Sequence, residues 1–382
     1  MRRCTETDNT KVLLPQKKQA RESNIELLRI ITMLGVIILH YNNKSMGGGL
    51  KFVKFGSTNF FVLYVLEVVF INAVNLFMLI SGYYMLSSQK RSVIKPVKLI
   101  IQVIAFGVTY YLLRVKFGSL KYSAFNFRGT FIPNDFFVIM YCCIYFISPY
   151  INIVLRSLDI EQLRRMIIIL LLLFSVYATA VEILGHFRGY KMYGLSSVTV
   201  DGSSQGYTIV NYSLMYIIGA YIKLDEAFLR KIKLPVLSAL FVLLSGIEVV
   251  WGYLYQKKHS EGSVVLSYCN PIVIALAVLA FLIFKKLNIG SNRVINFLAK
   301  ACFTAYLFHT YLFRYLSIEK YATGNPFILV IYTVGSAIII YLISFVVFCI
   351  YDLITSPIYK LIEKKIGNGT YTVSIKEKGG LA

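Results

Sequence analysis

Long apolar runs recur along the whole chain, and they restrict its fold more than any other feature. Several of them reach the roughly 20 residues that a helix needs to cross a bilayer. Of the 382 residues, 57% are hydrophobic and 15% are charged, whereas soluble domains carry about 25% charged residues. Only helices and closed barrels satisfy every backbone polar group in lipid. The runs lack the alternation of barrel strands, so we predict an all-α polytopic membrane protein.

We predict ten spans, with both termini in the cytoplasm. The spans are residues 25–43, 59–86, 93–114, 131–155, 166–184, 208–222, 234–256, 269–285, 296–314 and 327–352. The sixth span is the shortest, which allows a tilted or re-entrant segment there. In this arrangement the cytoplasmic segments carry about twice as many Lys and Arg as the outer loops, in line with the positive-inside rule. The basic outer loop 114–130 fits the assignment least well.

The predicted spans leave no room for a second folded domain. Residues 1–24 are polar and basic, so we expect a cytoplasmic N-terminal segment without a cleavable signal peptide. Residues 25–352 form the transmembrane domain, and residues 353–382 form a basic cytoplasmic tail that we expect to be partly disordered. We find no internal repeat, which disfavours a transporter built from inverted repeats.

The charge and cysteine content exclude two other classes of function. The net charge is +22, but the basic residues cluster between the spans, where they set topology and contact anionic lipid. We therefore predict a membrane lipid contact and no nucleic-acid partner. The six cysteines have no metal-ligand spacing with a histidine, so we interpret them as apolar packing residues and expect no metal.

Two ionisable side chains lie in the first span, whose sequence RESNIELLRIITMLGVIILHY covers residues 21–41. Arg29 and His40 are eleven residues apart, which is three helical turns plus roughly 20°, so both lie on one face about 16 Å apart along the axis. The predicted topology puts Arg29 near the cytoplasmic surface and His40 near the outer one. The pattern fits either two interfacial anchors or two parts of one site.

Other polar groups within the spans are candidates for an internal site, because ionisable groups are costly in lipid and usually face the protein interior. His309, in the ninth span, lies at a depth similar to that of His40, so the two can converge. Asn75, Ser81 and Gly82, in NAVNLFMLISGYYML, fit either polar helix packing or a site at the depth of Arg29. Four further ionisable groups in or beside the spans are Glu67, Glu182, His186 and Glu248. Glu182 and His186 have the spacing of a pair on one helix face.

Several common enzyme classes lack their sequence motifs. The chain has no nucleophile elbow, no zinc-protease His-Glu-x-x-His, no phosphate-binding loop and no dinucleotide fingerprint. Hydride transfer, nucleotide hydrolysis and metalloprotease chemistry are therefore not predicted.

Four segments together resemble the membrane acyltransferase-3 family. The first is residues 21–41, with a basic residue, ten intervening residues and a histidine. The others are NLFMLISGYYML, NYSLMYIIGAYIKL (residues 211–224) and TAYLFHTYLF (residues 304–313), in the family's order. They extend over most of the chain, which resembles the stand-alone form without an extracellular SGNH-type esterase domain.

This resemblance implies an O-acyltransferase of a cell membrane that moves an acyl group, usually acetyl, from cytoplasmic acetyl-CoA. The frequent use of Lys, Asn, Ile and Tyr is typical of an AT-rich bacterial genome, so we expect a bacterial cell membrane. The implied acceptor is a hydroxyl of a cell-surface or membrane-held carbohydrate. The resemblance implies His40 as the catalytic residue and Arg29 as its motif partner, and it places His309, Asn75 and Ser81 at motif positions. We expect His309 to assist catalysis, and Arg29, whose charge and geometry suit phosphate, to bind the donor with Asn75 and Ser81. A lipid or glycan transporter and a membrane sensor or scaffold stay open as alternatives. The oligomeric state and the acceptor stay undetermined.

Overall fold

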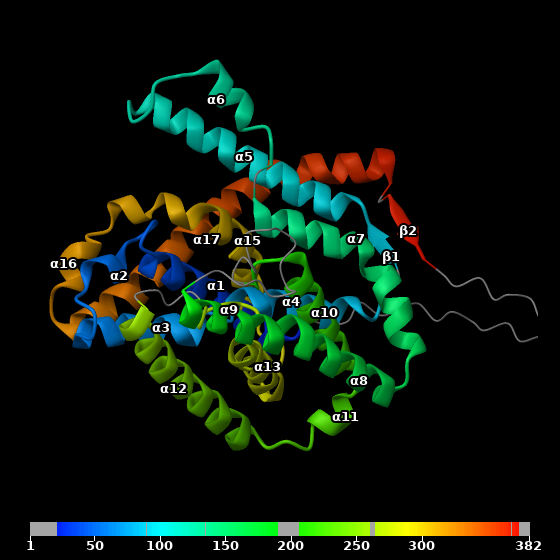
Figure 1. The fold of residues 1–382 in the computed structure, drawn as a ribbon. Helices are drawn as coiled ribbons and strands as arrows, with labels where there is room; N and C mark the ends of the chain where they lie inside the picture. The colour runs from blue at the N-terminus through cyan, green and yellow to red at the C-terminus, as the bar shows by residue number, and fades with distance from the viewer. Residues whose placement is uncertain are drawn as a thin grey trace, which may run out of the picture.

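The computed structural model describes residues 21–88, 90–133, 135–189, 206–259, 264–367 and 369–373, and it is mostly helical (Figure 1). Within this part of the chain, seven helical segments are long and apolar enough to cross a membrane. They are Ser23–Asn42, Thr58–Met85, Ile94–Lys116, Phe136–Ser157, Ile160–Gly185, Leu234–His259 and Pro326–Lys365. The chain is therefore a polytopic helical membrane protein, as the apolar runs predict.

Three of the ten predicted spans take a different form. Residues 208–222 and 269–285 correspond to α10 (Ile209–Leu224) and α13 (Pro271–Lys286), which have 16 residues each. Such a helix is about 24 Å long, shorter than the hydrocarbon core. Residues 296–314 form no continuous helix. They follow a broken course through α14 (Arg293–Leu298), η3 (Ala299–Ala301), α15 (Cys302–Phe308), η4 (His309–Tyr311) and η5 (Phe313–Tyr315). The number of spans and the side of the termini stay predictions.

Helix α1 (Ser23–Asn42) lies between the two halves of the core (Figure 1). One buried cluster joins its first turns to α4 (Ala73–Met85), α10 and α13. A second cluster joins its later turns to α3 (Thr58–Phe70), α15 and α17 (Pro326–Ile366). A residue on α1 can therefore face the space between these halves.

Helices α4 and α10 pack backbone against backbone because each carries a glycine at the contact. A Cβ atom on Gly82 would lie 2.0 Å from the carbonyl oxygen of Tyr216, and one on Gly219 would lie 2.1 Å from that of Leu79. Small residues permit such close helix contacts in membranes. The two glycines therefore let these helices approach more closely than larger residues would allow.

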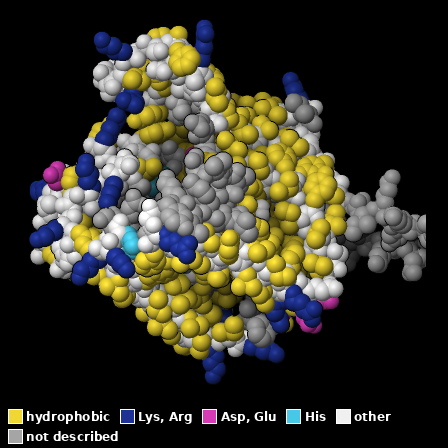
Figure 2. Space-filling model, in the orientation of Figure 1, with side chains coloured by type: hydrophobic (Ala, Val, Ile, Leu, Met, Phe, Trp, Pro, Cys, Tyr) yellow, Lys and Arg dark blue, Asp and Glu magenta, His cyan; other side chains and the backbone are white. Residues whose placement is uncertain are grey.

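The remaining elements surround this centre. They are α2 (Gly49–Phe52), α5 (Ile94–Lys116), α6 (Ala124–Gly129), α7 (Phe136–Ser157), α8 (Ile160–Leu171), the π-helical η1 (Leu172–Val176), α9 (Tyr177–Arg188), α11 (Glu226–Leu229), α12 (Leu234–His259) and α16 (Ile318–Ala322). The end of α5 and α6 project away from the other helices (Figure 1). Figure 2 shows a broad apolar surface with Lys and Arg mainly at its edges, as expected of a lipid-facing surface.

The region after residue 352 contains more regular structure than the sequence predicts. Helix α17 continues to Ile366, and strand β2 (Thr370–Thr372) pairs antiparallel with β1 (Lys90–Ser92). An ion pair between Lys98 and Glu363, 2.6 Å apart, joins α17 to α5. The segment mixes apolar and basic residues, and this ion pair packs it against its neighbour. Residues 374–382 lie outside the described part.

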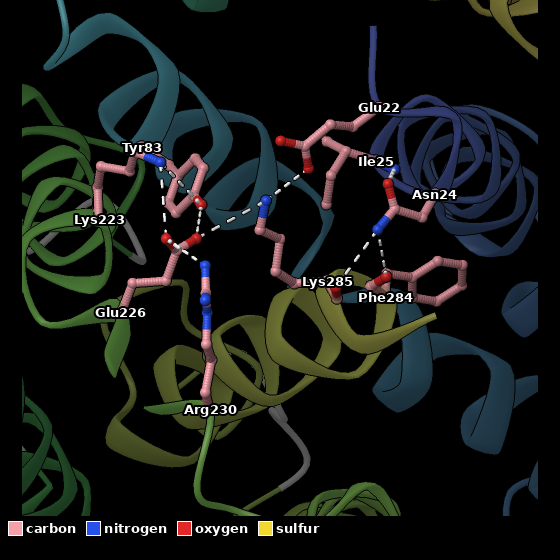
Figure 3. Close-up of polar contacts among 9 residues, drawn as sticks. All are labelled: Glu22, Asn24, Ile25, Tyr83, Lys223, Glu226, Arg230, Phe284 and Lys285. Atoms are coloured by element: carbon pink, nitrogen blue, oxygen red, sulfur yellow. Dashed lines mark hydrogen bonds and ion pairs between the residues drawn. The ribbon is translucent and has the colours of Figure 1, made fainter. Parts of the chain in front are cut away.

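A network of polar side chains joins the helix ends at one end of α1 (Figure 3). Its members are Glu22, Tyr83, Lys223, Glu226, Arg230 and Lys285. Glu226 is its centre: it accepts a hydrogen bond from the Tyr83 hydroxyl and lies 3.1 Å from Arg230 and 3.9 Å from Lys285. Lys285 also lies 2.5 Å from Glu22, which precedes α1. The network therefore ties the start of α1 to α4, α11 and α13.

The charge of Glu226 is stabilised by this network. Burial by itself raises the pKa of Glu226, but the Tyr83 hydrogen bond and the positive charges of Lys223, Lys285 and Arg230 lower it. The net effect is a pKa below the usual range of a glutamate. Because the pKa of Glu226 is lowered in the folded state, the ionised carboxylate stabilises the fold.

Candidate active site

A cavity of about 720 Å³ follows one face of α1. Arg29, Met33, Val36 and His40 line it, and their spacing of four, three and four residues defines a single helix face. Opposite walls come from several elements, through Phe77, Ser81, Phe137, Tyr141, Tyr207, Tyr268, Cys302, Phe303 and Tyr306 among others. The cavity has the size of ordinary small-molecule sites, about 300–1,000 Å³. The prediction that Arg29 and His40 share one helix face is confirmed, and that face lines the cavity.

One end of the cavity carries three cations. Arg21, Arg29 and Lys300 all line it. The guanidinium of Arg29 is 36% exposed and lies 3.5 Å from the carboxylate of Glu26, its neighbour one turn earlier. This end has a net positive charge from these four residues. It is suited to an anion such as phosphate, which arginine binds through paired N–H groups.

The other end of the cavity holds a pair of histidines. His40 lines the cavity, and its Nδ1 contacts Nε2 of His309. The two rings are nearly parallel, with an interplanar angle of 12° and centroids 4.7 Å apart. His309 is buried at the start of η4, where the helical chain tightens after Phe308. The convergence that their similar predicted depth allows is therefore present in the structure.

The hydrogen bonds of this pair assign its protons when both rings are neutral. Nδ1 of His309 lies 3.0 Å from the carbonyl oxygen of Ala305. A carbonyl oxygen only accepts, so Nδ1 of His309 must carry its proton and Nε2 must accept. Nδ1 of His40 then donates to that Nε2. Nε2 of His40 is left without a proton, and its lone pair is available to accept one.

Ser81 and Asn75, the other two predicted site residues, lie in different environments. Ser81 lines the cavity, and its hydroxyl donates to the carbonyl oxygen of Phe77 at 2.8 Å. Asn75 is buried and does not line the cavity. Its amide nitrogen donates to the carbonyl oxygen of Tyr268 at 2.8 Å, and its amide oxygen accepts from Asn211 at 3.0 Å. Asn75 thus holds the backbone of Tyr268, which does line the cavity.

The remaining intramembrane carboxylates lie outside this cavity. Glu67 accepts a hydrogen bond from Asn42 at 2.9 Å, and Glu248 accepts one from Asn270 at 3.1 Å. These partners are far away in sequence or lie in other elements, so spacing could not indicate them. The side chain of His186 lies outside the described residues, and its predicted pairing with Glu182 stays a prediction.

Two cationic lining residues, Arg21 and Lys300, are absent from the sequence-based site. Arg21 precedes the first predicted span, and Lys300 lies near the cytoplasmic end of the ninth, where basic residues are expected for topology alone. Their predicted depth is similar to that of Arg29, and this similarity could have identified Arg21 and Lys300 as residues of the same site. The aromatic lining residues gave no such signal, because tyrosine and phenylalanine are common throughout this chain.

Comparison with known proteins gives one match. A family model described as an acyltransferase domain matches residues 22–350, which include both histidines and Arg29. Neither the curated proteins nor the solved structures gave a match.

Proposed function

The chain belongs to the acyltransferase-3 family and is therefore a membrane acyltransferase, and we propose that its acyl donor is cytoplasmic acyl-CoA. The acyl group is acetyl, and the acceptor is a hydroxyl of a cell-surface or membrane-held carbohydrate. The membrane is the plasma membrane of a bacterium. One observation supports this proposal above all: a single cavity has cations at one end and a histidine pair at the other.

The shape and charge of the cavity suit acetyl-CoA. Its anionic nucleotide end would bind Arg21, Arg29 and Lys300, with Arg29 supplying a paired contact to phosphate. The pantetheine arm is long, thin and largely apolar, and it would lie along Met33 and Val36. Arg29 and His40 are about 16 Å apart along the helix axis. This distance is comparable with the length of that arm, so the thioester would reach the histidines.

The histidine pair suits general base catalysis. Nε2 of His40 takes the proton of the acceptor hydroxyl while the hydroxyl oxygen attacks the thioester carbonyl carbon. The carbon–sulfur bond then breaks, and His40 returns the proton to the sulfur, which yields the ester and free CoA. His309 keeps His40 in the required tautomer and accepts from its Nδ1 when His40 is cationic. Direct transfer is the simpler route, and an acyl-histidine intermediate is the variant.

The proposal is tested by the acetyl content of surface glycans. Mild alkali releases O-linked acetyl groups, which are then measured in the parent strain and in a strain that lacks the gene. We expect the released acetate to fall in the deletion strain while the amount of glycan stays unchanged. A transporter would give the opposite result, an altered amount of glycan with unchanged acetyl content per sugar.

A further inference from the structure

A second cavity, of about 760 Å³, lies beyond the histidine pair. Its lining residues come from the segment after α1, from α5 and from the η4–α16 region, and they include Met46, Tyr110, Thr310, Tyr311, Arg314 and Ser317. Met46 also lines the first cavity. Thr310 and Tyr311 directly follow His309 in η4. The two cavities thus share Met46, and the second lies next to the histidine pair in the chain, on the side that the predicted topology places outside.

The second cavity is polar, in contrast to the aromatic walls of the first. Hydroxyl groups of Thr310, Ser317 and two tyrosines line it. The rings of those tyrosines, Tyr110 and Tyr311, are stacked, with centroids 3.7 Å apart and an interplanar angle of 9°. Rigid hydroxyl-bearing side chains of this kind suit a carbohydrate, which offers many hydroxyl groups and some apolar C–H surface.

Positive charge exceeds negative charge at this cavity. Arg314 and Lys320 line it together with one carboxylate, that of Glu319. Arg114 does not line the cavity, but its guanidinium lies 5.6 Å from the ring centroid of Tyr110, which does, and its buried Nε has no hydrogen-bond partner in the described chain. None of these three cations has a carboxylate within 4 Å among the residues that the structure describes. The guanidinium of Arg314 donates to the Tyr315 hydroxyl at 2.7 Å, a neutral partner that leaves its positive charge available to a ligand.

We propose that this second cavity binds the acceptor and that the acceptor is an anionic carbohydrate, which carries a phosphate or carboxylate group. Arg314 binds the anionic group through its guanidinium. The sugar extends towards Met46, so that one hydroxyl reaches Nε2 of His40. The donor approaches the same nitrogen through the first cavity. This inference rests on the proposed function, because it assigns the acceptor site of that reaction.

The test uses purified protein in proteoliposomes, with radiolabelled acetyl-CoA and surface glycan extracted from the deletion strain. We expect Arg314→Gln to raise the apparent KM for that glycan about tenfold, the effect of losing one charge-assisted contact. Arg314→Lys should restore part of this loss. Lys121→Gln is the control, since it removes an exposed charge from the same predicted side without touching the cavity. The affinity for CoA should stay within twofold of wild type in all three variants.

The labelled product tests the charge of the acceptor directly. We expect it to bind an anion-exchange resin after the donor has been removed, and mass analysis then distinguishes phosphate from carboxylate. A labelled product that passes through the resin as a neutral species would overturn the inference, as would an unchanged KM in Arg314→Gln. If wild-type protein incorporates no label at all, the proposed function fails and the inference fails with it.

A second variant tests the location of the site without relying on charge. Thr310→Trp fills the second cavity next to His309 and should reduce transfer at least tenfold while CoA still binds. Full activity in a folded Thr310→Trp protein that binds CoA normally would exclude this cavity as the acceptor site.

Discussion

At the scale of single residues, the proposed catalysis depends on His40 and on the hydrogen bonds that set its tautomer. The Ala305 carbonyl fixes the tautomer of His309, and His309 in turn fixes that of His40. This chain of two hydrogen bonds leaves Nε2 of His40 unprotonated, and the His40 side chain lines the cavity. A general base needs this arrangement, because it must present a lone pair to the hydroxyl that it deprotonates.

His40→Ala should therefore abolish most of the transfer activity. General base catalysis contributes about 10²–10⁴-fold, so we expect a fall of that size in kcat for acetyl transfer by the purified variant. CoA affinity should be nearly unchanged, because the cations at the other end of the cavity remain. His259→Ala at the end of α12 is the matched control and should retain wild-type activity. Full activity in folded His40→Ala protein would refute the assignment.

Arg29→Ala should weaken donor binding without disrupting the fold. The guanidinium is part of the cationic end of the cavity and makes one contact, at 3.5 Å, with Glu26. Loss of a charge-assisted contact costs about 1.5–3 kcal/mol, so we expect the Kd for CoA to rise at least tenfold in a binding assay. Arg293→Ala, at the start of α14 and away from the cavity, should bind CoA normally. Unchanged CoA affinity in Arg29→Ala would count against the phosphate role.

At the scale of helices and strands, the site depends on close packing of α4 against α10 and on the network at the start of α1. Helix α4 supplies Ser81 and Phe77 to the cavity wall. Helix α10 supplies Asn211, which bonds the Asn75 amide that holds the Tyr268 backbone. A shift of α10 would therefore move the wall of the cavity.

Gly219→Ala tests this packing. The added Cβ would lie 2.1 Å from the Leu79 carbonyl oxygen, so the helices would have to separate. We expect a lower thermal midpoint in detergent and a smaller yield of folded protein. Gly246→Ala is the matched control, because a Cβ there meets no atom within 4 Å and alanine favours the helix. Equal midpoints in the two variants would contradict the packing argument.

Glu226→Gln tests the network around α11. The folded-state pKa of Glu226 is lowered, so its contribution to stability is present above the unfolded pKa of about 4.3 and is lost as the pH falls through the lower folded value. We expect the variant to have a lower thermal midpoint than wild type at pH 7. This difference should shrink as the pH is lowered below about 4. Asp352→Asn, at an exposed position on α17, is the control. A pH-independent difference would disprove the electrostatic explanation.

At the scale of the whole molecule, the sequence predicts the membrane fold and part of the site. The apolar runs identify the helices, and helical spacing alone places Arg29 and His40 on one face. Similar depth permits a contact between His40 and His309, because both lie in the predicted outer half of their spans, but depth alone does not predict that contact. These features are local or depend only on distance along the membrane normal.

Other features depend on contacts between distant segments, which the sequence does not encode locally. The apolar run at residues 296–314 suggests a continuous span, but the structure has several short helical elements there instead of one helix. Lys300 lines the first cavity and Thr310 lines the second. The pairing of β2 with β1 joins segments near opposite ends of the chain. The motif position of Asn75 is compatible with donor binding and with helix packing, so sequence alone does not separate the two roles. Its burial favours helix packing.

In the proposed mechanism, acyl transfer runs across the membrane, with the donor on one side of the histidine pair and the acceptor on the other. Sealed inverted vesicles that contain the protein, supplied externally with radiolabelled acetyl-CoA, measure this most directly. We predict that alkali-labile label accumulates on glycan inside the vesicles, that an external esterase cannot remove it, and that His40→Ala vesicles show none. Label that forms only when acetyl-CoA is supplied to right-side-out vesicles would contradict the account.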